Sequence, residues 1–527
     1  MALTTSNLFS KNFELNQTDF GDPFPFPIII SNNQAYKCLI VLKNENCERV
    51  LNVNTMQEFE IVDSILNWGG LKGHIIIEDK MNVVERGNSI DSTLKSSTNS
   101  EFVFRNDGRD FLRIEIYPVD LLKKGHEIPD EWKILYTFSI TKIEDIPSEN
   151  NINKFKKISF CNAIYCYLSQ LNINWSTATT KNNKVGLTLS LKEEPRSLLI
   201  SDALQALLKD SFNELFILDN NFPGDQQIID VNNWENSDNK IFYTSPIGNT
   251  VADDIQYLQS LCHGEKHDVC IFAQDRTTKQ WYLRSIHKIF EQANENQIAH
   301  GILEGMSNLK VSNVSFAPIV QEAGNMNLDI PSKITRFVFN EMTAETNLNK
   351  ITNRPVFMYD YINKKFYNYT KLNTPNEIKT YIKDNYLQPL QDNMSGNDFG
   401  GIKNDYVNLG VNKMKTMYKS INPITSEYNV SLNTIHDHEG RNAGLYHALF
   451  SNQNISMDIE GATYFKSGKI MAIESPGQFA NKWDYKLMGQ WLITEVKMLW
   501  NKNVFRSQVS CVKPYAAGEL KINENVL

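Results

Sequence analysis

The hydrophobic residues near the start of the chain follow the alternating pattern of half-buried β-strands. Residues 111–117 and 134–143 carry apolar side chains at nearly every second position, and this spacing places those side chains on one face of a sheet. Two further apolar-rich runs, 36–42 and 74–77, have the length of strands. Short strands at this spacing predict a small barrel or sandwich over roughly the first 150 residues.

The pattern changes to helical spacing after residue 146. Residues 158–168 and 201–210 place apolar side chains three and four positions apart, the repeat that forms one face of a helix. Ser201 is of a residue type that can cap the start of the second helix. We therefore predict two helices in a mixed α/β region.

The clearest predicted helix follows Thr250. Thr250 fits the N-cap, Asp253 fits the N3 position of a capping box, and Gly264 fits the C-cap. Residues 269–273 and 281–286 then form two apolar-rich runs of strand length. A helix followed by two strands indicates an α/β unit.

The rest of the chain returns to strand patterns around a mixed segment. Residues 345–440 are mixed and Asn-rich with a predicted loop at 393–401, and 441–452 suits a helix. No repeat of fixed period is present. The best predicted strands of this part are 334–340, 469–473, 491–499 and 506–512.

The composition bounds the class of protein. A length of 527 residues suggests about three or four domains, and 41% hydrophobic residues are enough for sizeable cores. The 53 basic and 61 acidic residues give a net charge of −8, which argues against a broad nucleic-acid-binding face. The start of the chain lacks the pattern of a signal peptide, and no run of 18 apolar residues occurs, so we expect no membrane-spanning segment.

The seven cysteines are odd in number and irregularly spaced, and most lie in apolar surroundings. We therefore expect buried free thiols, as in a protein assembled in a reducing cytoplasm. The cysteines are Cys38, Cys47, Cys161, Cys166, Cys262, Cys270 and Cys511.

Two clusters contain residue types that bind metals. Cys262, His263, His267 and Cys270 lie within nine residues, but their spacing is not that of a standard zinc finger and no second Cys/His pair follows. We expect two buried thiols and two loop histidines here rather than a zinc site.

The second cluster contains His436 and His438. Residues two apart share one face of a strand and could chelate a metal. The surrounding Asn, Asp and Gly residues favour a solvated loop. We therefore expect no metal and no cofactor in this protein.

Catalytic signatures are weak in this sequence. A cell-wall hydrolase would need two carboxylates in a cleft, one of them in an apolar environment. The adjacent pairs at 144–145 and 253–254 point apart, and capping explains Asp253. The sequence contains no G-x-S-x-G, H-E-x-x-H or P-loop motif. We therefore expect no enzymatic activity.

The aromatic residues near the end of the chain have two interpretations. Trp491 alternates with Ile493 and fits a barrel core. Trp500 lies at a predicted turn and is the better candidate for a subunit interface, where aromatic residues are common.

Four segments in this order resemble the baseplate central hub proteins of contractile-tail phages, typified by the T-even hub. The same fold forms the N-terminal part of type VI secretion spike proteins. Each segment contains only strand, helix and turn patterns, so the resemblance rests on their order and spacing over most of the chain. The chain is longer than a typical hub, through loops near 85–101, 175–195 and 385–425. The segments are 63–79; 248–264 leading into 269–275; 334–340; and 468–473 with 489–500 and 505–513.

The resemblance implies a β-rich, multidomain α+β protein in which α/β domains are inserted between two related, tube-like β-barrels. In a trimer, six such barrels would make a pseudo-sixfold ring that matches a hexameric tail tube. The implied division is 1–150 for the first barrel, 151–300 for the α/β domain, 301–345 with 445–515 for the second barrel, 346–444 for a mixed insertion that packs with the α/β domain, and 516–527 for a tail.

The implied function is that of a structural virion protein in the tail baseplate, assembled in the host cytoplasm. Its expected partners are two further copies of the chain, the tail tube or a tube-initiator protein, and a separate central spike protein. The tape measure protein and the baseplate wedge proteins are further expected neighbours. Two alternatives remain open at this point: a tail-tip cell-wall hydrolase, and a tail-tip protein that binds a receptor or carbohydrate.

Overall fold

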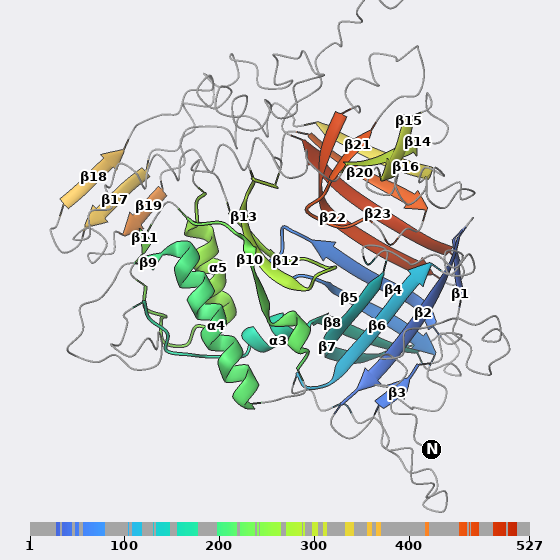
Figure 1. The fold of residues 1–527 in the computed structure, drawn as a ribbon, viewed down its shortest axis with the longest axis horizontal. Helices are drawn as coiled ribbons and strands as arrows, with labels where there is room; N and C mark the ends of the chain where they lie inside the picture. The colour runs from blue at the N-terminus through green and yellow to red at the C-terminus, as the bar shows by residue number, and fades with distance from the viewer. Residues whose placement is uncertain are drawn as a thin grey trace, which may run out of the picture.

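A computed structural model describes the chain in parts (Figure 1). The described residues are 28–31, 34–44, 48–51, 56–78, 104, 108–118, 130, 133–147, 155–177, 198–218, 222–237, 240–241, 243–264, 270–286, 288–289, 298–303, 309–313, 333–341, 356–360, 365–369, 417–420, 453–460, 463, 465–473, 489–501 and 504–513. The predicted helix at 441–452 and the predicted loops at 85–101 and 393–401 lie outside them.

The N-terminal strands form one curved antiparallel sheet, here called the first sheet. Its inward side chains alternate with outward ones, as the sequence pattern predicted; along β6, for example, Leu112, Ile114 and Ile116 are buried in the core. In spatial order its strands are β1 (Ile28–Ser31), β2 (Gln34–Lys43), β6 (Phe111–Pro118), β7 (Ile134–Ile146), β8 (Phe155–Asn162), β5 (Lys72–Glu78) and β4 (Met56–Ser64), with β3 (Glu48–Val50) on β2.

The C-terminal strands form a second group whose pairings return to their starting strand. From β22 they run through five further strands, and the last of these pairs with β22 again. The order is β22 (Gly489–Asn501), β21 (Ile470–Ile473), β14 (Ile298–Leu303), β16 (Lys333–Glu341), β20 (Gln453–Glu460) and β23 (Val504–Lys513), with β15 (Leu309–Asn313) on β14.

The two groups of strands are joined through β4 and β22. Residues 495–501 of β22 pair with residues 58–64 of β4 in antiparallel register, so the two groups form a single 15-stranded sheet. Their inward side chains share one hydrophobic core. Across this core the rings of Tyr36 and Phe505 lie 5.1 Å apart. The two β regions are therefore one packed body.

Gly73 marks a crowded point in this sheet. It lies in β5, between Ile61 of β4 and Phe160 of β8. A Cβ atom added at Gly73 would lie 2.0 Å from the carbonyl oxygen of Glu60 and 2.8 Å from the ring of Phe160. Only glycine allows the strands to approach this closely.

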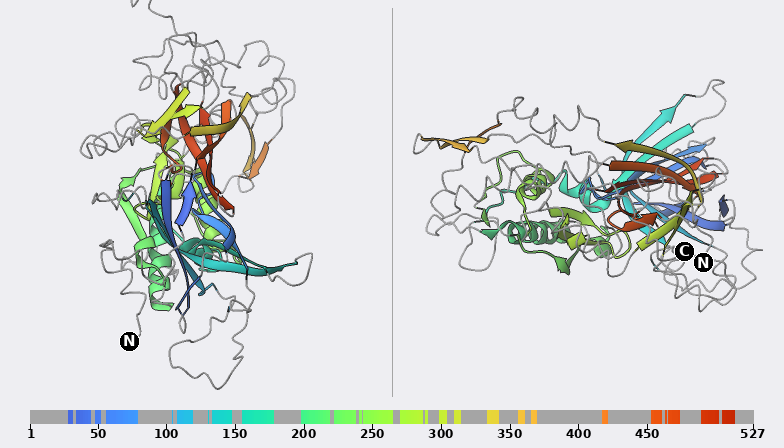
Figure 2. Two further views of the ribbon diagram at one scale, coloured as in Figure 1. Left: turned by 90° about the vertical axis from the view of Figure 1, so that its right-hand side faces the viewer. Right: turned by 90° about the horizontal axis from the view of Figure 1, so that it is seen from above.

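An α/β layer packs beside the first sheet in both figures (Figures 1 and 2). Its core combines the apolar faces of three helices with a three-stranded sheet. The layer contains α3 (Ala163–Leu168), α4 (Ile200–Leu218), α5 (Val251–Leu261), the 3-10 turn η4 (Gly224–Gln226), β10 (Ile228–Trp234), β12 (Cys270–Gln274), β13 (Gln280–Ser285), and the short pair β9 (Leu198–Leu199) and β11 (Lys240–Ile241).

A further small sheet contains β17 (Val356–Asp360), β18 (Lys365–Tyr369) and β19 (Met417–Ser420). No helix among the described residues is both long enough and apolar enough to cross a membrane. Among the described residues, the fold is mostly β with few helices.

The helix predictions need three corrections. Residues 155–162 form strand β8, because this segment lies between β5 and β7 and buries alternate side chains; the helix begins only at Ala163. Ser201 is not a cap: it lies inside α4, and its hydroxyl accepts a hydrogen bond from the Ser237 amide at 3.0 Å. The capping box of Thr250 and Asp253 is confirmed, but α5 ends at Leu261, and its C-cap is Cys262, whose backbone is extended, instead of Gly264.

Candidate functional site: the junction of three segments

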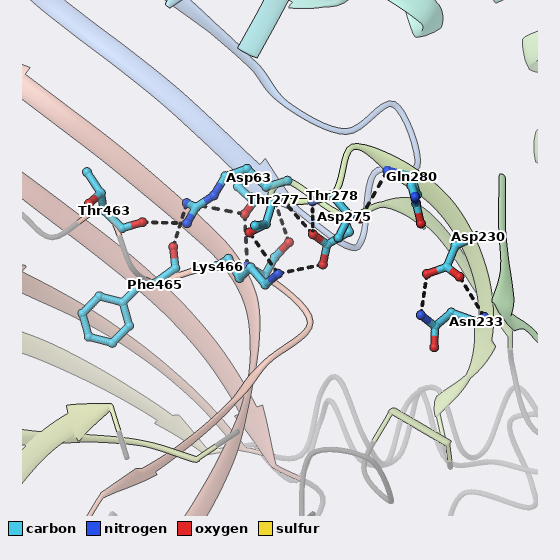
Figure 3. Close-up of polar contacts among 12 residues, drawn as sticks. Asp63, Asp230, Asn233, Asp275, Thr277, Thr278, Gln280, Thr463, Phe465 and Lys466 are labelled. Carbon is cyan, nitrogen blue, oxygen red and sulfur yellow. Dashed lines mark hydrogen bonds and ion pairs between the residues drawn. The ribbon is translucent and has the colours of Figure 1, made fainter. Parts of the chain in front are cut away.

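Three segments that are distant in sequence meet in a group of buried and partly buried polar side chains, here called the junction (Figure 3). They are the end of β4, the turn between β12 and β13, and the connection between β20 and β21. The junction consists of Asp63, Asp275, Arg276, Lys466 and Ser467. It therefore joins the first sheet, the α/β layer and the C-terminal strands.

Arg276 holds the connection between β20 and β21. Its Nη1 atom donates to the carbonyl oxygen of Phe465 at 2.8 Å, and its Nη2 atom donates to that of Thr463 at 2.6 Å. The residue is only 5% exposed. Because the guanidinium is planar and permanently charged, its two donors fix both carbonyls in one orientation.

Asp63 links the end of β4 to the same connection. Its carboxylate accepts hydrogen bonds from the amide of Ser467 at 3.1 Å and from its hydroxyl at 2.7 Å, and it lies 4.0 Å from Nη1 of Arg276. Gly468, which follows Ser467, has φ +79°, and an added Cβ there would lie 3.3 Å from both Ile65 and Tyr282. The three segments are therefore packed tightly together.

Lys466 and Asp275 form the second ion pair of the junction. The Nζ atom of Lys466 donates to Asp275 at 2.7 Å and to the hydroxyl of Thr277 at 3.2 Å. Asp275 also accepts from the amides of Thr277 and Thr278 at 2.8 and 2.9 Å. Burial raises the pKa of Asp275, but the charge and hydrogen bond of Lys466, the hydrogen bond from the Thr278 amide and the charge of Lys469 together lower it more, so this pKa lies well below its usual range.

The arrangement of these groups determines what the junction can do. Two cations face two carboxylates, and their hydrogen bonds go to one another, to the backbone and to the hydroxyls of Thr277 and Ser467. Buried ion pairs of this kind add little net stability, but breaking one is costly, so they favour a single arrangement of the segments. The junction is therefore suited to fixing the orientation of three parts of the molecule.

A second polar contact, here called the seam, lies between the first sheet and the α/β layer. The side-chain oxygen of Gln274 accepts from the Tyr136 hydroxyl and from the side-chain amide nitrogen of Asn162. The amide nitrogen of Gln274 donates to the carbonyls of Gln226 at 3.2 Å and Lys279 at 2.8 Å. Burial, followed by nearby acidic groups, raises the pKa of Tyr136 well above its usual value, so this hydroxyl remains a donor.

The structure describes part of the predicted metal clusters. Cys262, His263 and Cys270 are buried, and the amide of Cys270 donates to the carbonyl of Cys262 at 3.4 Å. Within the described ranges, no group of three or more His, Cys, Asp or Glu residues could hold a metal ion. His267, His436 and His438 lie outside those ranges.

The carboxylates considered for catalysis have structural partners. In β7, Glu144 pairs with Lys142, and Asp145 pairs with the buried Lys156. Both carboxylates are exposed to solvent.

The second carboxylate pair lies in the first turn of α5. Asp253 completes the capping box. Asp254 is fully buried, and because three donors satisfy it, it has the surroundings of a structural carboxylate. The donors to Asp254 are Tyr243 at 2.7 Å, Ser245 at 2.6 Å and Asn249 at 3.1 Å.

The two tryptophans near the end of the chain both lie in the shared core. Trp491 is fully buried, as predicted. Trp500 is 7% exposed, and its register partners are Phe59 of β4 and Phe505 of β23. Core packing thus accounts for most of its surface, and its role at a subunit interface stays a prediction.

Sequence reasoning did not identify Arg276 and Lys466 as site residues. The signal available for the first was its place in the turn Asp275-Arg-Thr-Thr, where the aspartate accepts from amides two and three residues ahead. No pattern marked Lys466, because its partner is 191 residues away.

No protein-family model matches the sequence, and no curated protein matches it. The fold is similar to that of a tail protein from Neisseria meningitidis MC58, with 7% identity, a TM-score of 0.40, and coverage of 90% of this chain and 96% of that one. It is also similar to the 43 kDa tail protein of prophage MuSo2 from Shewanella oneidensis, with 8% identity, a TM-score of 0.44, and coverage of 91% and 98%. A third similar structure is the E. coli c3393 protein, a component of the type VI secretion system, with 7% identity, a TM-score of 0.36, and coverage of 90% and 78%.

Proposed function

We propose that this chain is the central hub of a contractile-tail phage baseplate, a structural virion protein without enzymatic activity. Three copies form a pseudo-sixfold ring that joins the hexameric tail tube to a trimeric spike. Each copy contributes two tube-like barrels, residues 1–150 and residues 301–345 with 445–515. In this proposal β8 completes the first barrel and β14 the second, and the rest of the α/β domain at 151–300 and the insertion at 346–444 lie outside the ring.

The observation that carries the proposal is the convergence of the segments that resemble hub proteins. Asp63 belongs to the first of these segments, Asp275 to the second, and Gly468 to the fourth. All three lie at the junction, although more than 400 residues separate the first from the last. Three of the four segments that carry the resemblance therefore meet at one place in the fold.

The geometry of the junction suits a symmetry adaptor. A ring that matches a sixfold tube on one face and a threefold spike on the other requires subunits with a fixed internal geometry, because each interface must close. The shared core and the buried ion pairs of the junction favour one relative orientation of the two β regions. The edge strands of the first sheet would then meet neighbouring copies in the ring.

The test is electron microscopy of the purified chain at high concentration, alone and with a candidate trimeric spike protein. A threefold particle with a central hole, formed in either sample, would support the hub. Monomers without a hole in both samples would contradict it.

Two activity assays address the alternative functions. A pure hub gives no clearing in zymography on cell-wall material, whereas a hydrolase does. Binding on a glycan array or to host cells would favour the receptor-binding alternative.

A further inference from the structure

Strand β7 is paired along only one side in its second half. Residues 134–139 pair with β6, and the amide of Ile140 adds a hydrogen bond to the carbonyl of Asp110 at 2.7 Å. A β-bulge between Ile140 and Lys142 then bends the strand. Residues 142–146, here called the open edge, pair with β8 on one side, and no strand in the described part of the chain pairs with their other side. In Figure 2 the hairpin of β7 and β8 lies at the rim of the molecule.

The side chains of the open edge alternate between the two faces of the sheet. Lys142 and Glu144 lie on the outer face and are 63% and 41% exposed. Ile143 lies on the inner face, where it is partly buried and packs against the shared core. Asp145, 64% exposed, shares the inner face. Because an unpaired strand edge presents N–H and C=O groups, this segment is a template for one further strand.

The order of charges along the open edge is complementary to itself. When two copies align antiparallel with Ile143 opposite Ile143, Lys142 of each copy lies opposite Glu144 of the other. Opposed residues of an antiparallel pair project from the same face. Both charge pairs therefore form on the outer face, and the two isoleucines meet on the inner face. Pairs of opposite charge and pairs of β-branched residues both stabilise an antiparallel sheet.

Neighbouring registers are less favourable. Centring the pair on Lys142 places the two lysines opposite each other, and centring it on Glu144 does the same for the two glutamates. Like charges that are directly opposed destabilise a sheet. A slip by one residue sets the inner face of one copy beside the outer face of the other. The open edge thus fits a second copy of itself in the register centred on Ile143.

We propose that residues 142–146 of β7 pair with the same residues of a second copy of this chain, antiparallel and centred on Ile143. The two first sheets then continue into each other across a two-fold axis. This contact goes beyond the proposed ring and does not depend on it, because it uses β7 and not the edge strands of the first sheet. Since the interface is one strand wide and carries charge pairs, the association is weak and decreases with salt.

The test is sedimentation velocity of the full-length chain over a range of concentrations, which should show a step that doubles the particle mass. Lys142→Glu and Glu144→Lys each place like charges at both contacts, so each alone should weaken this step about tenfold. An equimolar mixture of the two variants should restore it, because each contact again joins a lysine and a glutamate. Lys209→Glu, at an exposed position of α4, should leave the step unchanged. Urea midpoints equal to that of the wild type verify that the variants are folded.

A cysteine at the centre of the contact tests its register. Opposed Cα atoms of antiparallel strands lie about 4.5–5.5 Å apart, a separation that a disulfide spans. Ile143→Cys should therefore cross-link two copies under mild oxidation. Asp145→Cys should not, because its two copies would lie roughly 14 Å apart in this register. Trypsin releases residues 143–154 as one peptide without a native cysteine, so mass spectrometry identifies the cross-link.

Three results would overturn the proposal. The first is a wild-type particle whose mass does not double at any concentration. The second is a doubling step that Lys142→Glu and Glu144→Lys leave unchanged. The third is cross-linking of Asp145→Cys as efficient as that of Ile143→Cys. A threefold particle that forms without the doubling step would reject this contact alone and leave the proposed ring intact.

Discussion

Substitution of Arg276 by methionine should destabilise the chain strongly. The variant keeps most of the apolar volume of the side chain and removes its charge and its donors. The carbonyls of Thr463 and Phe465 then lose their buried donors, at about 1–3 kcal/mol each. Asp63 also loses the nearby cation. Since removal of one partner from a buried ion pair costs about 3–5 kcal/mol, we expect a loss in this range.

The assay is equilibrium unfolding in urea, followed by tryptophan fluorescence, together with amide hydrogen exchange. Hydrogen exchange should accelerate first at residues 465–469 and 275–279, because these segments meet at Arg276. Arg276→Lys keeps the charge but cannot direct two donors at the two carbonyls, so its loss should be intermediate. Lys142→Met removes an exposed partner of Glu144 and serves as the matched control, with little change expected.

The comparison of Arg276→Met with the control tests whether the ion pairs of the junction hold the three segments together. If it unfolds at the same urea concentration as Lys142→Met, and hydrogen exchange near residues 465–469 is unchanged, then the ion pairs of the junction do not hold the segments together. The structural argument for the proposed function would then lose its basis.

Three further predictions concern single residues. Burial raises the pKa of Glu115 to about 7, although Arg113 opposes this shift; the associated stability is present below the unfolded pKa and is lost as the pH rises through 7. The free energy of unfolding should therefore fall by about 3 kcal/mol between pH 4.5 and 7 because of this group, and Glu115→Gln should remove that fall. The measurement is the urea midpoint at each pH. The exposed Glu144→Gln should leave the dependence in this window unchanged. Gly73→Ala should cost more than about 3 kcal/mol in urea unfolding, because its Cβ would collide with the backbone of β4; Gly224→Ala, with open space around it, should change stability by under about 0.5 kcal/mol. Thr250→Ala should cost about 1 kcal/mol through loss of the capping box, with faster hydrogen exchange in the first turn of α5; unchanged exchange there would contradict this.

Local patterns predicted the elements whose stability is local. The alternation at 111–117 and 134–143 predicted strands β6 and β7, and the caps at Thr250 and Asp253 predicted the start of α5. These signals are visible in a short window because each depends on neighbours within a few residues. The burial of most described cysteines followed from their apolar surroundings in the same way.

The sequence pattern missed the features that depend on packing between distant segments. Residues 158–162 have helical spacing, yet they form a strand because β5 and β7 leave a place for one between them. Arg276 and Lys466 could not be recognised as a site, because their partners come from segments nearly 200 residues away. The pairing of β4 with β22 has the same origin.

That pairing also affects how the chain is made. Ser64 and Glu495 are register partners, but about 430 residues are synthesised between them, which takes roughly 20–90 s at the usual rates of translation. During this time the edge of β4 has no partner from its own chain, and an open edge is a template for pairing with other chains. Newly made N-terminal segments on neighbouring ribosomes could therefore pair with one another, so the yield of folded protein should depend on how slowly or quickly the C-terminal strands arrive.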